Sequence, residues 1–211
     1  MVVSHIADKI VSGELPGGSQ IRQEAIANEL GVSRVPVREA LLQLEADGLV
    51  QIATHRGAIV SNLSKADAVD VFEARRTLEL FLLEKAVEAA GAEDYERAED
   101  ILRRYDDAVQ QNASPARLSQ LNWDYHLGLL QPADRPRTLN VIKTLYTSLD
   151  RYLRLQIRPR SAQAAAIRDH WQIYEAYVKR DTKTVVALSK EHIDHAYEEV
   201  LLRLDQMPLS E

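Results

Sequence analysis

Hydrophobic residues recur at intervals of three and four along most of the chain, the spacing that places them on one face of an α-helix. Near the N-terminus, Gly13 and Gly31 divide this pattern into short pieces. Around residue 50 it gives way to two short apolar runs, which indicate β-strands. The expected elements are a helix ending at Gly13, helices over 23–30 and 33–46, and strands over 49–52 and 58–60. Three helices followed by a two-stranded hairpin predict a winged helix-turn-helix domain.

From Ser64 onward the pattern is helical throughout, and proline-containing or polar segments interrupt it. Ser64 and Asp67 resemble a capping box at the start of a long helix that runs to Gly91. Further helices are expected over 93–112, 115–131, 137–157, 162–180 and 182–205. The sequence therefore predicts a mainly α protein, with the winged helix-turn-helix domain at 1–62 and an all-α bundle of about six helices at 63–211.

The segment from Gly31 to Val50 has the layout of a DNA-recognition helix. Arg34 and Arg38 lie four residues apart at its start, on one face, where the first turn of such a helix enters a major groove. An arginine there can bind guanine through two hydrogen bonds, worth about 1–3 kcal/mol of discrimination. The alternative is that both arginines are solvated surface charges. The apolar residues that repeat at helical spacing behind them are Val37, Ala40, Leu41 and Leu44.

The charge of the chain argues against a generally basic nucleic-acid binder. The net charge is −6, and residues 1–62 carry five basic and seven acidic side chains. Non-specific affinity for DNA should therefore be weak, and binding must depend on a local cationic patch, which a homodimer would double. An acidic protein that never meets DNA is the alternative, and only the motif can exclude it.

Composition also bears on the compartment. The 211 residues include no cysteine, and 45% of them are hydrophobic. The lack of thiols excludes a disulfide framework and thiolate metal sites and fits a reducing cytoplasm. No apolar run approaches the ~18 residues of a membrane span, and the N-terminal residues do not form the apolar block of a signal peptide. We therefore expect a cytoplasmic protein with a packed core and no membrane partner.

Three of the six histidines fall on separate expected helices of the bundle, namely His126, His170 and His192. Asn122 lies four residues before His126 and projects from the same helical face. Antiparallel neighbouring helices could bring the imidazoles to one point, where they would suit zinc or another late first-row divalent ion. Three histidines and an oxygen with open positions are also the layout of a catalytic metal site. His195, one turn from His192, is expected at the surface or behind the ligands, and a place in the core or on the surface is the ordinary alternative for any single histidine.

Four runs of residues carry a resemblance to a known family: Gly13-Glu-Leu-Pro-Gly-Gly-Ser-Gln-Ile21, Ile26-Ala-Asn-Glu-Leu-Gly-Val-Ser-Arg-Val-Pro-Val-Arg-Glu-Ala-Leu41, Asp47-Gly-Leu-Val50 and Arg56-Gly-Ala-Ile-Val60. Together they resemble the winged-helix domain of GntR-type bacterial transcription regulators. In the remainder, Glu73-Ala-Arg-Arg-Thr-Leu-Glu79 and Asn122-Trp-Asp-Tyr-His126 resemble the first long helix and the first metal-ligand pair of the FCD effector domain in the FadR-like branch. His170 and His192 fall where the two later ligand histidines of that domain fall.

The resemblance implies a DNA-reading role for the start of the recognition helix. Arg34 and Arg38 would read bases, and Ser33 would approach the DNA backbone. Val35 and Pro36 are apolar, so they could only contact a thymine methyl or set the angle of the helix.

The wing and the preceding helix would add or remove contacts. Arg56 and Gly57, at the tip of the wing, would reach into the adjacent minor groove or touch a phosphate. Arg22 and Gln23 could contact a phosphate as well. Glu24 stands where some relatives carry a cation that faces DNA, so one contact is expected to be lost.

The resemblance also implies a divalent metal ion held by Asn122, His126, His170 and His192. Zinc is the first expectation, and nickel and manganese are compatible with three histidines. Many relatives carry aspartate where this chain has Asn122. A neutral amide carbonyl should lower the metal affinity and raise the charge of the site by one unit, which would make a bound anion more welcome.

Arg75 matches the family arginine that faces the effector cavity, whereas a helix-surface ion pair with Glu73 or Glu79 is the alternative. Arg151 and Tyr152 lie on a helix that could close the same cavity. The metal ion and an arginine would grip a small carboxylate effector at both ends. Asp194 would orient a ligand imidazole if it points inward.

These observations favour a ligand-responsive regulator that binds a palindromic operator as a homodimer. By resemblance it would repress an operon of carboxylic-acid or sugar-acid metabolism and release the DNA when the acid binds. One alternative is a DNA-binding scaffold with a purely structural metal. A more distant alternative is a metal-dependent hydrolase on the helical bundle, although Asp124, the nearest acid to His126, would face away from it and no other general base is evident.

Overall fold

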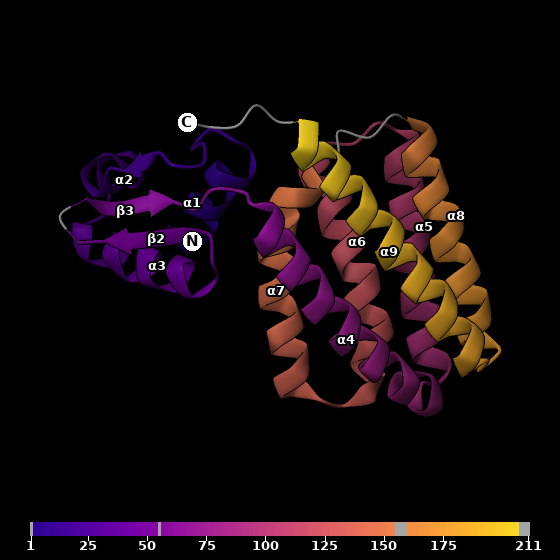
Figure 1. The fold of residues 1–211 in the computed structure, drawn as a ribbon. Helices are drawn as coiled ribbons and strands as arrows, with labels where there is room; N and C mark the ends of the chain where they lie inside the picture. Colours follow the sequence, from indigo (N-terminus) through magenta and orange to yellow (C-terminus); the bar gives the residue numbers. More distant parts are fainter. Residues whose placement is uncertain (1, 55, 155–159, 207–211) are drawn as a thin grey trace.

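The computed structural model describes residues 2–54, 56–154 and 160–206 and places them in two parts (Figure 1). The first part is built as the sequence predicts, from three helices and a hairpin. Its elements are α1 (Val2–Val11), α2 (Gln23–Leu30), α3 (Arg34–Ala46), β2 (Val50–Ala53) and β3 (Gly57–Val60). Gly31 ends α2 in the left-handed conformation, with φ of 65°, which is the conformation that glycine adopts without strain.

A third strand, β1 (Gln20–Ile21), completes the sheet and was not expected from the sequence. The strand order is β1-β3-β2, and both pairs are antiparallel. In the register of the added pair Gln20 faces Ile59. Two residues are too few to show an alternating pattern, so the strand follows from the turn before it: Gly18, with φ of 75°, donates its N–H to the Val60 carbonyl at 2.8 Å.

The second part is a bundle of helices, again as predicted. Within the described residues it contains α4 (Lys65–Ala89), α5 (Ala92–Gln110), α6 (Pro115–Leu130), the short 3-10 helix η1 (Gln131–Ala133), α7 (Pro136–Arg154), α8 (Arg160–Val178) and α9 (Thr182–Gln206). The helix ends differ from the expected ones by a few residues, except that the expected end of α7 at residue 157 lies outside the described residues. None of the helices in the described part of the chain combines the length and apolar composition that crossing a membrane requires.

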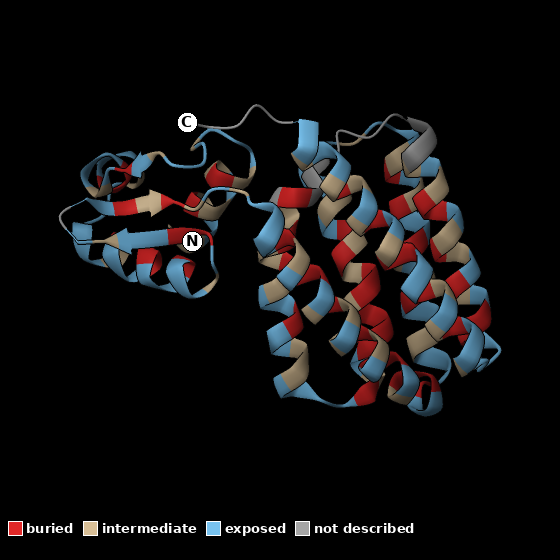
Figure 2. Cartoon of the chain, in the orientation of Figure 1, coloured by how far each residue is buried: buried red, intermediate tan, exposed pale blue. Residues whose placement is uncertain are grey.

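Each part has its own apolar core. Figure 2 shows buried residues on the inward faces of the bundle helices and exposed residues on the outward faces. In the winged part, the four apolar residues predicted behind the recognition helix are all buried. Among the residues that the structure describes, the two cores share no buried residue, and the chain passes from one to the other between Val60 and Ala68.

Helix α4 begins where the chain enters the bundle, and its first turn is fixed by α7. Ser64 Oγ accepts a hydrogen bond from the Asp67 N–H at 3.0 Å, as the predicted capping box requires. The other half of the box passes through Tyr152 of α7: the Ser64 N–H donates to its hydroxyl at 3.2 Å, and that hydroxyl donates to Asp67 Oδ2 at 2.5 Å. The α7 helix therefore holds the start of α4 in place.

Helix α7 also contacts the winged part directly. It packs against α1, and it lies on the side of the bundle next to the winged part in Figure 1. Ser148 Oγ donates a hydrogen bond to the backbone carbonyl of Asp47, the residue that ends α3, at 2.8 Å. One helix of the bundle thus touches the far end of the predicted recognition helix.

Candidate functional sites

The first candidate site is the exposed start of α3. Arg34, Val35 and Arg38 are exposed, and Val35, although apolar, leaves 57% of its surface accessible. Pro36 is half-buried in the first turn, where its missing N–H leaves no helical hydrogen bond unmade. Ser33 holds the N-cap position with an extended backbone, but its side chain makes no capping hydrogen bond. The structure therefore leaves this turn free to meet a partner.

The wing lies beside that turn. Gly57 begins β3 with φ of 72°, and Arg56, just before it, is exposed. Gln20 Nε2 donates to the Arg56 carbonyl at 2.6 Å, so β1 is tied to the wing at Arg56. His55 lies outside the described residues. Strand β1, which the sequence did not predict, thus helps to position Arg56 and Gly57, which were predicted to contact DNA.

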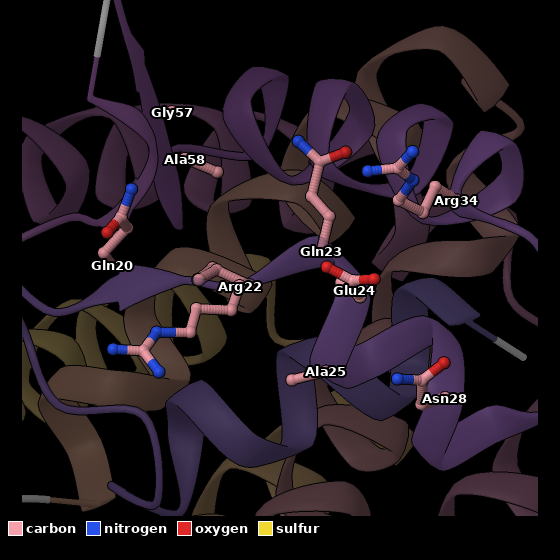
Figure 3. A pocket seen from close by; sticks show the side chains of 10 residues that line it. Gln20, Arg22, Gln23, Glu24, Ala25, Asn28, Arg34, Gly57 and Ala58 are labelled. Carbon is pink, nitrogen blue, oxygen red and sulfur yellow. The ribbon is translucent and has the colours of Figure 1, made fainter.

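A hollow of about 650 Å³ separates the wing from the starts of α2 and α3. In Figure 3, Gln20 and Arg22 lie on one side of it and Arg34 on the other, with Gln23 and Glu24 between them. Two guanidinium groups and the N-terminus of α2 suit a phosphate, because a helix N-terminus offers unpaired N–H groups and a partial positive charge. Glu24 brings a negative charge to the same surface.

The second candidate site is a cluster of three buried histidines inside the bundle. His126 of α6, His170 of α8 and His192 of α9 place one ring nitrogen each within 4.8 Å of the others, a grouping that could hold a metal ion. Nε2 of His170 and Nε2 of His192 are 3.1 Å apart. The Tyr125 hydroxyl donates to the His170 carbonyl at 2.7 Å and so ties α6 to α8. The structure brings together the three residues that the sequence placed on separate helices.

Carboxylates lie behind two of these imidazoles. Glu79 Oε2 is 3.8 Å from His126 Nδ1, and Asp169 Oδ2 is 3.5 Å from His192 Nδ1. A carboxylate on the far nitrogen of a metal-binding imidazole orients the ring and leaves the near nitrogen for the metal. His126 Nε2 is buried without a hydrogen-bond partner among the described residues. The donor set therefore fits a divalent ion bound through Nε2 atoms.

The electrostatics of His126 agree with this role. Burial, and then the positive charge of Arg75, holds the pKa of His126 well below its usual value. The imidazole is therefore neutral at ordinary pH, which is the form that binds a metal. Hydrogen bonding to His192 lowers the pKa of Asp169, so that carboxylate stays ionised behind its ring.

A buried ion pair lies next to the histidines. Arg75 Nε donates to Glu79 Oε1 at 2.5 Å, and the two side chains are only 1% and 2% exposed. The alternative for Arg75 was an ion pair on the helix surface with Glu73 or Glu79. The ion pair exists and its partner is Glu79, but it is buried and does not lie on the surface. Burial is the largest single influence and lowers the pKa of Arg75, but Glu79 and Tyr146 together outweigh it, so this pKa lies above its usual value.

Two aromatic residues that the sequence did not single out cover this pair. The rings of Trp123 and Tyr146 stack with centroids 4.1 Å apart, and the Arg75 guanidinium carbon is 5.3 and 5.5 Å from those centroids. Arg75 Nη2, Trp123 Nε1 and the Tyr146 hydroxyl are buried and have no hydrogen-bond partner among the described residues. Burial, and then the Glu79 carboxylate, raises the pKa of Tyr146 well above its usual value, so its hydroxyl keeps its proton.

The other residues expected near the metal or the effector differ in whether they lie close to the three histidines. Asn122 is half-buried on α6, one turn before His126. The side chain of Arg151 lies outside the described residues. Tyr152 is buried, but its hydroxyl bonds to Ser64 and Asp67 at the start of α4. His195 is exposed.

Asp194 was expected to orient a ligand imidazole only if it pointed inward, and its hydrogen bonds go to other side chains. Asp194 Oδ1 accepts from Arg76 Nη1 at 2.9 Å, and Asp194 Oδ2 accepts from Lys190 at 2.6 Å, so it serves the helix surface. Asp169, which directly precedes His170, takes the expected place behind His192. Its position next to a candidate ligand was the signal that could have found it.

The same two parts of the chain are found in known families. The family described as "Bacterial regulatory proteins, gntR family" matches residues 1–60, and the FCD domain matches residues 70–195. An uncharacterized HTH-type transcriptional regulator of Mycobacterium tuberculosis (strain ATCC 25618 / H37Rv) is 43% identical over 72 residues, which are 34% of this chain and 30% of that protein. The HTH-type transcriptional repressor RspR of Escherichia coli (strain K12) is 26% identical over 183 residues, covering 87% of this chain and 80% of the repressor.

Among solved structures, E. coli McbR/YncC superposes with a TM-score of 0.83 at 19% identity and covers 97% of this chain and 96% of that one. At this identity the likeness concerns the fold. The matched families and relatives are transcription regulators and not enzymes, so the hydrolase alternative has no support from them.

Proposed function

This chain belongs to the GntR family of bacterial regulatory proteins and carries an FCD domain, and we propose that it is a ligand-responsive transcription repressor that leaves its operator when a small organic acid binds beside a metal ion. Residues 1–62 would bind the DNA, and residues 63–211 would sense the acid and form the homodimer. The relative RspR is named a repressor, and we assign the same sign of regulation here, to an operon of carboxylic-acid or sugar-acid metabolism.

The observation that carries the DNA-binding role is the exposed first turn of α3 beside the wing. Arg34 and Arg38 would read base edges, since a guanidinium matches the two acceptors of guanine. Ser33, Val35 and Pro36 would lie against the backbone or a thymine methyl. Arg56 and Gly57 would contact the adjacent minor groove or a phosphate. A two-fold symmetric dimer would present two such surfaces to a palindromic operator.

The sensing role is supported by the buried histidine cluster, which lies beside buried hydrogen-bond donors of Arg75, Trp123 and Tyr146 that have no partner among the described residues. His126, His170 and His192 would hold the ion, most simply zinc, with nickel and manganese as alternatives and Asn122 as a further oxygen ligand. When bound, the ion would supply a positive charge that anchors an anionic oxygen of the acid. Arg75 would bind the other end of the acid.

Helix α7 supports a route from the acid to the DNA. Tyr146 stacks on Trp123 beside Arg75. Two residues later on the same helix, Ser148 donates a hydrogen bond to the Asp47 carbonyl at the end of α3. Tyr152, a turn further on, holds the start of α4. A displacement of α7 by the acid would therefore change both its contact with the winged part and its contact with the start of α4, where the chain enters the bundle. A coupling free energy of about 1–3 kcal/mol would change operator affinity roughly 5- to 150-fold.

DNA binding is tested by fluorescence anisotropy with DNA from upstream of the gene. Arg34→Ala and Arg38→Ala should each weaken specific binding roughly 5- to 150-fold, the equivalent of about 1–3 kcal/mol per lost base contact. Arg104→Ala, on the exposed face of α5, is the matched control and should bind as the wild type does. If the wild-type protein binds no upstream DNA at low salt, the proposed DNA-binding role is wrong.

Sensing is tested on the same protein by metal analysis and melting. We expect stoichiometric zinc in the wild type, its loss in His170→Ala, and its retention in the control His195→Ala, whose imidazole is exposed. Small organic acids should raise the melting temperature of the metal-loaded protein and lower its operator affinity. Metal retention with no response to any acid would instead favour the DNA-binding scaffold with a structural metal.

A further inference from the structure

The charge of Arg75 is already balanced inside the protein. Its Nε bonds to Glu79 Oε1 at 2.5 Å, and both side chains are almost fully buried. A second carboxylate brought to this place would face one guanidinium and one carboxylate together. The result would be a net buried negative charge, which is costly because no water solvates it.

Near Arg75 the site has buried hydrogen-bond donors, and the one positive charge among them is already balanced by Glu79. Arg75 Nη2 and Trp123 Nε1 are both buried and lack a hydrogen-bond partner among the described residues, and the Tyr146 hydroxyl is in the same condition. All three belong to one cluster, since Trp123 and Tyr146 stack and Arg75 lies over both rings. Buried donors call for acceptors, and a neutral oxygen satisfies them without adding charge.

The positive charge of the site lies at the other end. The three histidines would be neutral as metal ligands and Asn122 is uncharged, so no ligand atom of this set would carry a negative charge against a divalent ion. The ring of His126 is 6.1 Å from that of Trp123 and 6.3 Å from that of Tyr146, centroid to centroid. A ligand that contacts both groups therefore needs a length of only a few carbon atoms.

We infer that the effector is a monocarboxylate that also carries a neutral acceptor oxygen, a hydroxyl or a carbonyl, and that Glu79 excludes the dicarboxylate of the same length. The carboxylate lies at the histidine end and the neutral oxygen lies at Arg75 and Trp123. This inference rests on the proposed sensing function. It replaces the expectation that the metal ion and Arg75 grip a carboxylate effector at both ends.

The test compares acids that differ only by the change of a terminal CH2OH group to a carboxylate. Suitable pairs are glycolate and oxalate, 3-hydroxypropionate and malonate, 4-hydroxybutyrate and succinate, and gluconate and glucarate. Binding to the zinc-loaded full-length protein is measured by calorimetry. In the pair that binds best, the hydroxy acid should bind at least about tenfold more tightly than the dicarboxylate.

Glu79→Gln tests the cause of that preference. The amide keeps the size of the side chain and can still accept from Arg75, but it removes the negative charge. The dicarboxylate should then gain affinity relative to the hydroxy acid by at least about tenfold. Glu84→Gln, on the exposed side of the same helix, is the matched control and should leave the ratio unchanged.

The outcomes separate the inference from the function on which it rests. A wild-type protein that binds the dicarboxylate as tightly as its partner, or a folded Glu79→Gln variant with the wild-type ratio, overturns the inference and leaves the sensing function intact. If no acid of any pair binds, the proposed function and the inference fall together. If Glu79→Gln does not fold, the wild-type comparison decides alone.

Discussion

Removing the Ser148 hydroxyl should weaken the communication between the two parts of the protein. Ser148 Oγ donates at 2.8 Å to the Asp47 carbonyl, which ends α3, and this carbonyl has no helical partner of its own. Because α3 has 13 residues, the contact lies roughly 20 Å from the turn that carries Arg34, at a rise of about 1.5 Å per residue. Ser148→Ala should therefore leave the DNA-contacting groups in place.

The magnitude follows from the single hydrogen bond that is lost. One such bond contributes about 0.5–1.5 kcal/mol, so the free energy of unfolding should fall by about that amount. A contact cannot transmit more free energy than it contributes, so the acid-dependent change in operator affinity should shrink by at most about 2- to 13-fold. Operator affinity without the acid should change less than twofold.

The assay is the anisotropy titration of operator DNA, with and without saturating acid, at one fixed salt concentration. Thr147→Ala is the matched control, because the Thr147 hydroxyl donates to the Lys143 carbonyl at 3.2 Å within α7 and does not reach the winged part. The reasoning is refuted if Ser148→Ala keeps the full response to the acid, or if both variants lose it equally.

The other predictions concern single charges and hydroxyls. Glu24→Gln should raise the affinity for any DNA roughly two- to fivefold in gel shifts at low salt and less at high salt, because it removes a like charge from the hollow of Figure 3; equal affinity at low salt would contradict that placement. Tyr152→Phe should lower the urea-measured free energy of unfolding by about 1–2 kcal/mol, because the hydroxyl bridges Ser64 and Asp67; unchanged stability would argue against the bridge. Burial raises the pKa of Tyr177 above its usual value, so the folded state holds this proton more tightly than the unfolded state. The stability it gives is complete below pH about 10 and is lost as the pH rises further, and melting curves should show a smaller alkaline loss in Tyr177→Phe.

The fold could be predicted from the sequence because most of its elements are long enough to show their period. Val37 and Leu41 on α3, four residues apart, are both buried, as their spacing indicates. The ends of α2 and α3 were marked by Gly31 and Gly48, each in the left-handed region. Strand β1 was not predicted, because two residues are too few to show a repeating pattern. It forms because the preceding turn brings Gln20 beside Ile59.

The interior of the sensing site could be predicted only in part. The three histidines were found because imidazole chemistry restricts their roles. An ion pair of Arg75 with Glu73 or Glu79 was one of two alternatives, and a spacing of four residues is the same on an exposed and on a buried face. What decides the burial is the packing of Trp123 and Tyr146 from other helices, which no local pattern encodes.

The buried pair beside the histidines is hard to explain by stability. Two charges lose their hydration when they are buried, and their attraction only roughly restores it, so apolar residues of similar size often stabilise a core at least as well. Here the cost is greater, because Arg75 Nη2 and the neighbouring Trp123 Nε1 have no hydrogen-bond partner among the described residues. A core built for stability alone would not leave such donors together. Their position between α4, α6 and α7, the last of which reaches the end of α3 through Ser148, is better explained by recognition of a ligand whose binding the winged part can detect.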